Sequence, residues 1–345
     1  MIRFLCSVGL LLATNLYGAT EDPVVIRVGF FPNLTHSPAL AARQLEREGK
    51  DWHLAHLPPG SKIEWKSYNA GPSAMEALLA GAIDLTYVGP SPVINAHVRT
   101  KGKEIRVLAP VARGGNALVV RKELGLKKPL DFLGRRLATP QLGNTQDIDA
   151  RVWLRKGGLK ITVNGGDAQI IPAANAELVL LFSRGDVDAA WTVEPWVTRL
   201  TTEFGGEILL ENKESIITVL ATSKSALAKN QRGIEAFVRS HYLLRDQLLA
   251  DRTWHENLVR NGIGGETRSA APKAEIINPA LARVIFDSRE DEQPRYQRLL
   301  SSFKHALKDA QESGLLNGDA PIEPLLESLV PDPAPANPAI PASAK

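Results

Sequence analysis

Short apolar runs alternate with segments of helical periodicity along the first third of the chain. The spacing between the runs predicts helices at 37–47, 73–80 and 92–100. Gly81 follows the second helix, where glycine commonly ends a helix. Strands that alternate with helices over short connections predict a mostly parallel sheet with both faces covered. The runs themselves predict strands at 24–30, 62–68, 83–88, 105–111 and 117–121.

The same alternation restarts near residue 137. From residue 225 onward helices dominate, and 233–249 is the longest. Two α/β units followed by a helical return predict two lobes. We expect the first lobe to comprise 24–112 with 220–330, and the second to comprise 113–219. The elements predicted in the second unit are strands at 137–139, 168–172, 187–192, 207–210 and 216–222, and helices at 145–156 and 174–183.

The two halves share one local motif. Residues 75–86 read as a helix, a glycine stop and a strand that opens on Asp84, and residues 178–191 repeat this arrangement around Asp188. Each copy is followed by a loop that contains proline. A repeat of this kind favours two paired lobes.

Both ends of the chain read as segments outside the fold. Residues 1–19 have a basic start, an apolar run too short to cross a bilayer, and a weakly polar end, which together predict a secretory signal peptide. A buried N-terminal strand or helix is the alternative. Cys6, the only cysteine, lies inside this segment, so the mature chain would have no disulfide or thiol nucleophile. Residues 331–345 are rich in proline and alanine and predict a disordered tail.

The overall composition limits the kinds of partner that the chain can bind. The chain has 345 residues, 44% of them hydrophobic, and a net charge of +3 from 41 basic and 38 acidic residues. This near-balance, without a basic stripe, argues against a nucleic-acid partner. No later stretch is long enough to span a membrane, so we expect a soluble product in the periplasm, with no stable membrane insertion after signal removal.

A search for catalytic motifs finds none. GxSxG, HExxH and GxxxxGK[ST] are absent, and the first strand leads into a loop without GxGxxG. The seven histidines are scattered. His53 and His56 form a pair without a nearby carboxylate partner, which we interpret as a surface feature. We expect no catalytic residue, no metal site and no cofactor.

Small polar residues recur at one kind of place, the loop between the end of a strand and the start of a helix. In open α/β sheets ligands bind there, because free backbone N–H groups and the positive end of the helix dipole face the crevice. Helix capping alone would explain any single loop. All of them together favour a shared cleft. The four loops are 32–37, 71–73, 89–92 and 140–145.

A fifth loop, 191–196, holds two tryptophans around an acid. Trp191 ends an apolar strand and suits either the core or a ligand site. We expect Glu194 and Trp196 at the rim of the cleft. Glu194 could cap a helix, orient a neighbouring donor or bind a cationic group.

Taken in order, several segments resemble the type 2 periplasmic binding proteins of nitrate, sulfonate, taurine and bicarbonate importers, a group that includes pyrimidine-precursor binders for thiamine synthesis. The resemblance covers roughly residues 24–316. The segments that carry it are 26–32, 71–84, 89–92, 131–139, 185–189 and 194–196.

The resemblance implies an α/β fold of two lobes joined by crossover strands near 111–115 and 216–221. It also implies a monomer that binds a small-molecule ligand and works with the permease and ATPase subunits of an ABC importer. From its position in the 191–196 loop, we also expect Trp196 to lie at the ligand site, at the rim of the cleft. The binding positions of the family map onto Asn33, Thr35, His36, Gly71, Pro72, Ser91, Asn116, Asn144, Thr145 and Glu194.

The ligand class is open at this point. A small oxyanion is favoured, an aliphatic sulfonate such as taurine first and nitrate next, held by helix N-termini, hydroxyls and His36. A thiamine-precursor pyrimidine, stacked on Phe31 and Trp196 with Glu194 as acceptor, is the alternative. An enzyme on the same fold is a remote third reading, because the related synthases depend on a cysteine-rich segment.

Overall fold

The computed structural model describes residues 22–268, 270–287 and 292–333. The predicted signal peptide (1–19) with Cys6, and residues 334–345 of the predicted tail, lie outside the described residues. The start of that tail, 331–333, is described. Asp332 there forms an ion pair with Arg245, with 2.8 Å between the nearest nitrogen and oxygen. These first tail residues therefore contact the first lobe.

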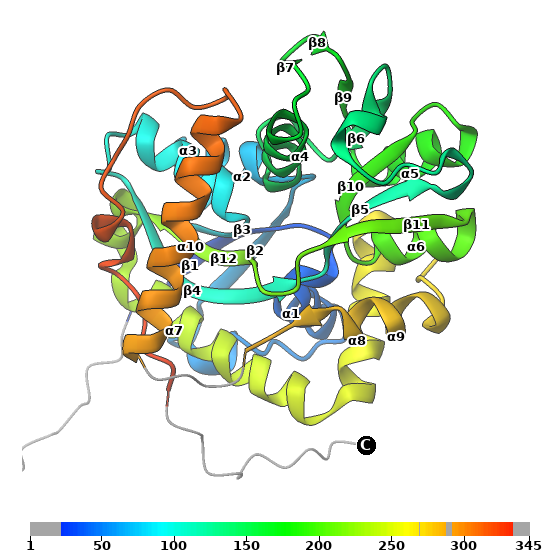
Figure 1. The fold of residues 1–345 in the computed structure, drawn as a ribbon. Coiled ribbons are helices and arrows are strands. Elements are labelled where there is room, and N and C mark those ends of the chain that lie inside the picture. The colour runs from blue at the N-terminus through cyan, green and yellow to red at the C-terminus, as the bar shows by residue number, and fades with distance from the viewer. Residues whose placement is uncertain (1–21, 269, 288–291, 334–345) are drawn as a thin grey trace, which may run out of the picture.

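The first lobe is built on a six-stranded sheet with the order β13-β4-β12-β3-β1-β2 (Figure 1). This sheet lies in the hydrophobic core of the first lobe. Ile26, Val28 and Phe30 of β1, for example, are completely buried. The edge strand β2 is largely exposed. The strands are β1 (Val25–Phe30), β2 (Lys62–Ser67), β3 (Leu85–Val88), β4 (Ile105–Gly114), β12 (Ile216–Ser223) and β13 (Val284–Ile285).

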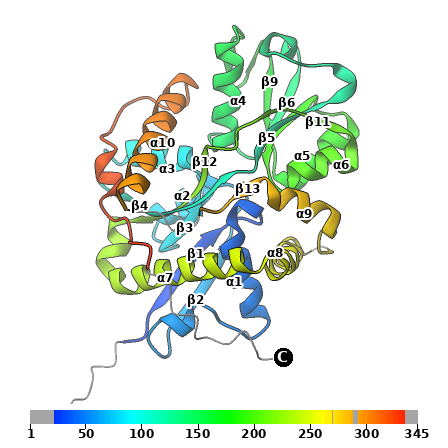
Figure 2. The ribbon, with the colours of Figure 1, turned by 60° about the horizontal axis from the view of Figure 1, so that its bottom comes forward.

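Helices pair on this sheet, α1 against α8 and α3 against α10. The longest, α7, contains a non-helical residue at Asn230. One helix, α9, packs against α6 of the second lobe instead, as Figure 2 shows. The helices are α1 (Ser37–Arg47), α2 (Gly71–Leu79), α3 (Pro90–Arg99), α7 (Lys224–Ala250), α8 (Arg252–Thr267), α9 (Ala274–Ala282) and α10 (Glu292–Glu312).

The second lobe is built on a five-stranded sheet with the order β11-β5-β10-β6-β9 (Figure 2). A small hairpin of β7 (Ile161–Thr162) and β8 (Gly165–Gly166) lies beside it. The strands are β5 (Asn116–Arg121), β6 (Arg136–Thr139), β9 (Gln169–Pro172), β10 (Ala189–Val193) and β11 (Gly206–Glu211), and the helices are α4 (Thr145–Lys156), α5 (Asn175–Arg184) and α6 (Trp196–Phe204).

The repeated motif has the same structural role in both lobes. Asp84 accepts the backbone N–H of Arg27 at 2.8 Å, and its own N–H donates to the Arg27 carbonyl at 2.8 Å. In the second lobe, Asp188 accepts the backbone N–H of Arg136 at 2.7 Å and donates to the Arg136 carbonyl at 2.8 Å. In each lobe, the aspartate fixes its strand to a parallel neighbour, β3 to β1 and β10 to β6.

The predicted fold class is confirmed, because two α/β lobes are joined by two crossings of the chain. Most strands of each sheet run in one direction, as predicted, although each sheet also holds antiparallel strands. In the first, β12 runs antiparallel to β3 and β4, and in the second, β5 runs antiparallel to β10 and β11. The strands β5 and β12 directly follow the crossings, so each enters its sheet from the side of the other lobe, and β13 also runs antiparallel, to β4.

The chain passes between the sheets at residue 115, from β4 to β5, and at 212–215, from β11 to β12. The first crossing lies within the expected 111–115. The second comes just before the expected 216–221, because Ile216 already pairs with Arg113 of the first sheet. The exact division of the chain into lobes stays a prediction.

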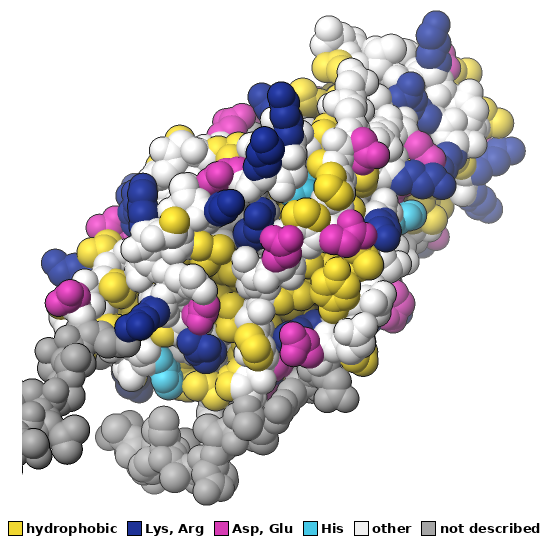
Figure 3. All heavy atoms as spheres, turned by 90° about the vertical axis from the view of Figure 1, so that its left-hand side faces the viewer, with side chains coloured by type: hydrophobic (Ala, Val, Ile, Leu, Met, Phe, Trp, Pro, Cys, Tyr) yellow, Lys and Arg dark blue, Asp and Glu magenta, His cyan; other side chains and the backbone are white. Residues whose placement is uncertain are grey.

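Charged side chains of both signs are interspersed on the face seen in Figure 3, which is the left-hand side of Figure 1. Among the helices of the described residues, none is long and apolar enough to cross a membrane. Within the same residues, no group of three or more histidine, cysteine and acidic side chains is arranged to hold a metal ion.

Candidate ligand-binding site

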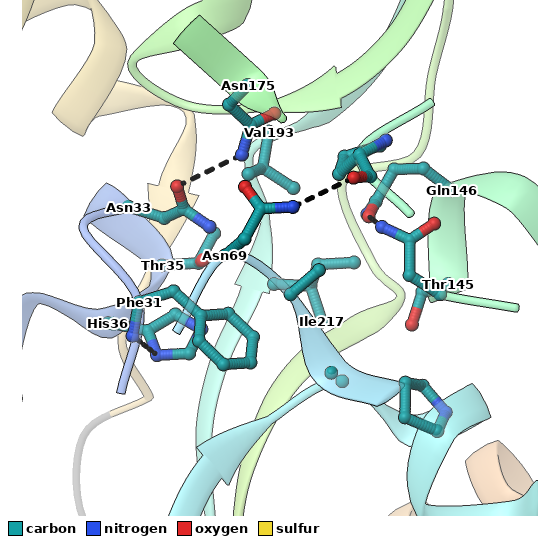
Figure 4. Close-up of a pocket in the computed structure, with 16 residues that line it drawn as sticks. Phe31, Asn33, Thr35, His36, Asn69, Thr145, Gln146, Asn175, Val193 and Ile217 are labelled. Atoms are coloured by element: carbon teal, nitrogen blue, oxygen red, sulfur yellow. Dashed lines mark hydrogen bonds between the residues drawn. The ribbon is translucent and has the colours of Figure 1, made fainter. Parts of the chain in front are cut away.

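A pocket lies where the loops of the two lobes meet, and its space of about 380 Å³ is partly open to solvent (Figure 4). All four loops singled out in the sequence contribute to it. The first lobe supplies the loops after β1, β2 and β3, and the second supplies the loop after β6 and residues near β9 and β10. Its lining residues are Phe31, Asn33, Thr35, His36, Asn69, Ala70, Gly71, Gly89, Pro92, Pro140, Asn144, Thr145, Gln146, Asn175, Val193 and Ile217.

The loop after β1 forms a short 3₁₀ turn, Leu34–His36, that directs His36 toward the pocket. The His36 ring lies against Phe31, with 4.4 Å between the ring centroids. Its Nδ1 accepts the backbone N–H of Phe31 at 3.3 Å. Burial lowers the pKa of His36 to about 3. The imidazole is therefore neutral at pH 7, and its Nε2 carries the proton and can donate.

The N-termini of α2 and α3 form one wall of the pocket. Prolines at the start of both helices remove several of the free N–H groups that a helix start usually offers. Gly71 lies so close to Pro92 that a Cβ on the glycine would stand 2.3 Å from the Pro92 Cγ. A Cβ on Gly89 would stand 2.5 Å from the Thr145 hydroxyl of the opposite lobe. Gly89 thus permits the two lobes to approach closely here.

The N-terminus of α4 forms the opposite wall and is tightly held. Asn144 caps the helix by accepting the N–H of Asp147 at 2.9 Å. The completely buried Asp147 carboxylate accepts the N–H of Gly143 at 2.8 Å and pairs with the buried Arg151 at 3.0 Å. These bonds fix the 140–144 loop. By helix geometry the N–H groups of Thr145 and Gln146 have no partner within α4.

The Thr145 hydroxyl is a buried polar atom without a hydrogen-bond partner among the described residues. An unsatisfied buried hydroxyl is costly, and water or a ligand usually satisfies such a group. Because Thr145 lines the pocket, a molecule held there can supply the missing partner.

Hydrogen bonds cross the cleft on both sides of the pocket. The side-chain Oδ1 of Asn33 accepts from Trp196 Nε1 at 2.9 Å and from Asn175 Nδ2 at 3.4 Å. On the other side, Asn69 Nδ2 donates to the Pro140 carbonyl at 2.9 Å. These bonds hold the lobes together in the arrangement described here.

Six of the eleven predicted site residues line the pocket: Asn33, Thr35, His36, Gly71, Asn144 and Thr145. Three others lie nearby without lining it. Pro72 faces a neighbouring groove, and Ser91 is buried in the first turn of α3. Asn116 lies behind the lining residue Gln146, since its side-chain Oδ1 accepts from Gln146 Nε2 at 3.3 Å.

Glu194 and Trp196 are not at the rim, where the sequence analysis placed them. Both are buried and neither lines the pocket. Glu194 caps α6 by accepting from the N–H and the hydroxyl of Thr198, each at 3.0 Å, and Arg283 stands 3.4 Å away. Burial raises the pKa of Glu194 to about 7, although these partners favour the charged form. Trp196 acts on the pocket only through its bond to Asn33.

Three amide side chains of the pocket escaped the sequence analysis: Asn69, Gln146 and Asn175. Asn69 lies between β2 and α2, and Asn175 is the first residue of α5, so both stand where a strand leads into a helix, as the recognised loop residues do. The same rule would therefore have found them. Gln146 follows a recognised pair, Asn144 and Thr145.

The pocket is uncharged. Its lining includes no lysine, arginine, aspartate or glutamate, and its one histidine is neutral. The polar groups are four asparagines, one glutamine, two threonines and helix N-termini. Such a surface can hold an anion only through hydrogen bonds and the partial charge of helix ends.

Comparison with known proteins agrees with this architecture. The model of the NMT1-like family matches residues 19–256, more than half of the chain. The chain belongs to the NMT1-like family. Among curated relatives of this NMT1-like protein, the taurine-binding periplasmic protein of Escherichia coli K12 is 26% identical over 52% of the chain and 56% of the relative. A putative aliphatic sulfonates-binding protein of the same organism is 26% identical over 59% of each.

The NMT1-like chain thus spans little more than half the length of these curated relatives. Solved structures align over more of it. The alkanesulfonate-binding protein SsuA from Xanthomonas axonopodis pv. citri, bound to MOPS, has a TM-score of 0.68 at 20% identity, over 89% of this chain and 99% of that one. The nitrate-binding protein NrtA of Synechocystis PCC 6803 has a TM-score of 0.66 at 14% identity, over 86% and 83%. At these identities the likeness establishes the fold.

Proposed function

We propose that this protein is the periplasmic substrate-binding component of an ABC importer, which captures a small oxyanion between its lobes and catalyses nothing. An aliphatic sulfonate such as taurine is the favoured ligand, and nitrate comes next. The observation that carries the proposal is the uncharged pocket between two lobes, with the unpartnered Thr145 hydroxyl on its wall. The curated relatives that bind taurine or aliphatic sulfonates support the ligand class.

The donors suit an oxyanion in number and kind. The first N–H groups of α4, the Thr145 hydroxyl and the Nε2–H of His36 can each donate to one oxygen of a sulfonate or nitrate. The α4 N-terminus adds the positive end of its dipole. Because the donors are neutral and enclosed, binding should depend weakly on ionic strength.

In this proposal the ligand is captured as the lobes close. The lobes would be 24–112 with 220–330 and 113–219, and the crossings near residues 115 and 212–215 would bend. Closure would bring Thr145 against Gly89 and form the bonds across the cleft that Asn33 accepts and Asn69 donates. The closed monomer would then dock on the permease, whose ATPase subunits drive release.

Isothermal calorimetry tests the ligand class. Purified protein is titrated with taurine, ethanesulfonate, nitrate and bicarbonate, each at low and at moderate salt. We expect micromolar or tighter binding of a sulfonate, with less than a threefold change between the salts. If no anion gave a measurable heat of binding, the proposal of an oxyanion ligand would be wrong.

A pyrimidine is the second candidate, because Phe31 lines the pocket and five amide groups could pair with ring nitrogens and amino groups. Trp196 and Glu194 do not take the roles first expected for them, since neither reaches the pocket. Titration with an aminopyrimidine in the same calorimeter distinguishes the candidates. Binding of the pyrimidine together with flat heats for the sulfonates would favour this second function.

A further inference from the structure

A second polar cavity lies away from the ligand pocket, between α7, α10 and strand β4, and its space of about 270 Å³ is partly open to solvent. It adjoins the strand that leads to the first crossing, because Pro110 and Val111 of β4 form part of its wall. Its charged and polar lining consists of Tyr242, Arg245, Asp287, Arg295, Arg298 and Asp332.

Both carboxylates of this cavity are already engaged. Asp332 accepts from Arg245 at 2.8 Å. Asp287 accepts from Arg113 Nε at 2.9 Å and also from Arg298. Arg245 also pairs with Asp246 outside the cavity at 2.6 Å, and the two carboxylates of the cavity bond arginines other than Arg295.

Arg295 is buried with only 2% of its surface exposed, yet its one hydrogen bond goes to a neutral group. Its Nη1 donates to the Tyr242 hydroxyl at 3.1 Å. Its Nε has no partner among the described residues, and no described carboxylate stands within 4.0 Å of its guanidinium. A buried cation without a counter-charge is strongly destabilising, so proteins pair such groups with an anion.

We propose that this cavity binds a small anion, an inorganic oxyanion or a short carboxylate, on the free Nε–H of Arg295. Guanidinium groups bind oxyanions through paired N–H donors, and Arg245 and Arg298 add positive charge around the cavity. The site is distinct from the ligand pocket, since the two share no lining residue. An anion here would lie against β4 close to the first crossing and would stabilise the folded protein.

Thermal unfolding with and without sulfate tests the site. Wild type, Arg295→Met and the control Arg239→Met, an exposed arginine on α7, are compared in zwitterionic buffer with 10 mM sodium sulfate or with sodium chloride of equal ionic strength. We expect sulfate to raise the Tm of the wild type and the control by about 3 °C more than that of Arg295→Met. Without sulfate, Arg295→Met should be at least as stable as the wild type, because a buried cation is removed. Repeating the comparison with acetate separates a preference for carboxylates from one for inorganic oxyanions.

Equal sulfate responses in wild type and Arg295→Met would overturn the proposal, as would Arg295→Met unfolding at a lower temperature in all buffers. Crystals soaked in bromide give an independent measurement. We expect an anomalous peak within hydrogen-bond distance of Arg295 Nε. A carboxylate of the chain itself seated on that nitrogen would show that no external anion is required.

Discussion

The two lobes face the ligand pocket with different chemistry. The first lobe presents glycines, Pro92 and the Phe31–His36 pair, which give shape and close approach. Its amide side chains, Asn33 and Asn69, are already bonded across the cleft. The second presents the N-terminus of α4, with Asn144, Thr145 and Gln146 in its first turn. Recognition of the ligand's oxygens should therefore depend mainly on the second lobe, and enclosure mainly on the first.

The difference extends to how each wall is held. Behind α4, the buried pair of Asp147 and Arg151 fixes the loop through Gly143. The walls of the first lobe are held by packing, as where Gly71 meets Pro92. We infer that the second lobe holds a rigid set of hydrogen-bond donors, whereas the first lobe supplies a closely packed surface that encloses the ligand.

Arg151→Met should have the largest effect, because it leaves the completely buried Asp147 without its counter-charge. We expect a loss of about 3 kcal/mol in the free energy of unfolding, measured with urea. The matched control is Arg199→Met, which breaks an exposed pair with Glu203 and should cost about 0.5 kcal/mol or less. Similar losses in both variants would show that the α4 wall is not specially held.

Gly89→Ala should come next, because the new Cβ would collide with the Thr145 hydroxyl across the cleft. We expect the affinity for the sulfonate to fall about 100-fold, about 2.7 kcal/mol, with little change in the Tm. The double variant Gly89→Ala with Thr145→Ala removes the colliding atom and should bind as well as Thr145→Ala alone. A single variant that binds like the wild type would mean that the lobes do not close at this point.

Thr145→Val keeps the shape of the side chain and removes its hydroxyl. We expect about a tenfold loss of sulfonate affinity in calorimetry, the value of one hydrogen bond to a charged ligand. Thermal stability should stay the same or rise, because the unbound hydroxyl is buried without a partner. A variant that keeps full affinity would place the ligand elsewhere in the pocket.

The smallest expected effect concerns Glu194, whose backbone carbonyl accepts the N–H of Leu34 from the other lobe. Because burial raises its pKa to about 7, the folded protein holds this proton more tightly than the unfolded chain does. The resulting stability is present at low pH and is lost as the pH rises through 7. Glu194→Gln should therefore remove a decline of about 1 kcal/mol between pH 6 and pH 8, measured by urea unfolding. An unchanged slope would mean that Glu194 is already ionised at pH 6.

Much of the fold and part of the site follow from local pattern. The α4 helix was predicted with its true bounds, and the loops of the pocket were found because parallel strands end at one edge of a sheet. Strand direction near the crossings could not be predicted, since it depends on which lobe the chain has come from. The positions of Glu194 and Trp196 could not be predicted either, because a polar group beside a strand end can turn toward a neighbouring helix or toward the cleft. Only the packing of α6 against the loop of Asn33 decides between them.

The most direct test of the account is a crystal structure with bromoethanesulfonate, whose bromine is located by anomalous scattering. If the pocket captures sulfonates, we expect one well-occupied site in the cleft, with the sulfonate oxygens at hydrogen-bond distance from the Thr145 hydroxyl and the first N–H groups of α4. A fully occupied sulfonate outside the cleft, with the pocket between the lobes holding only water, would contradict it.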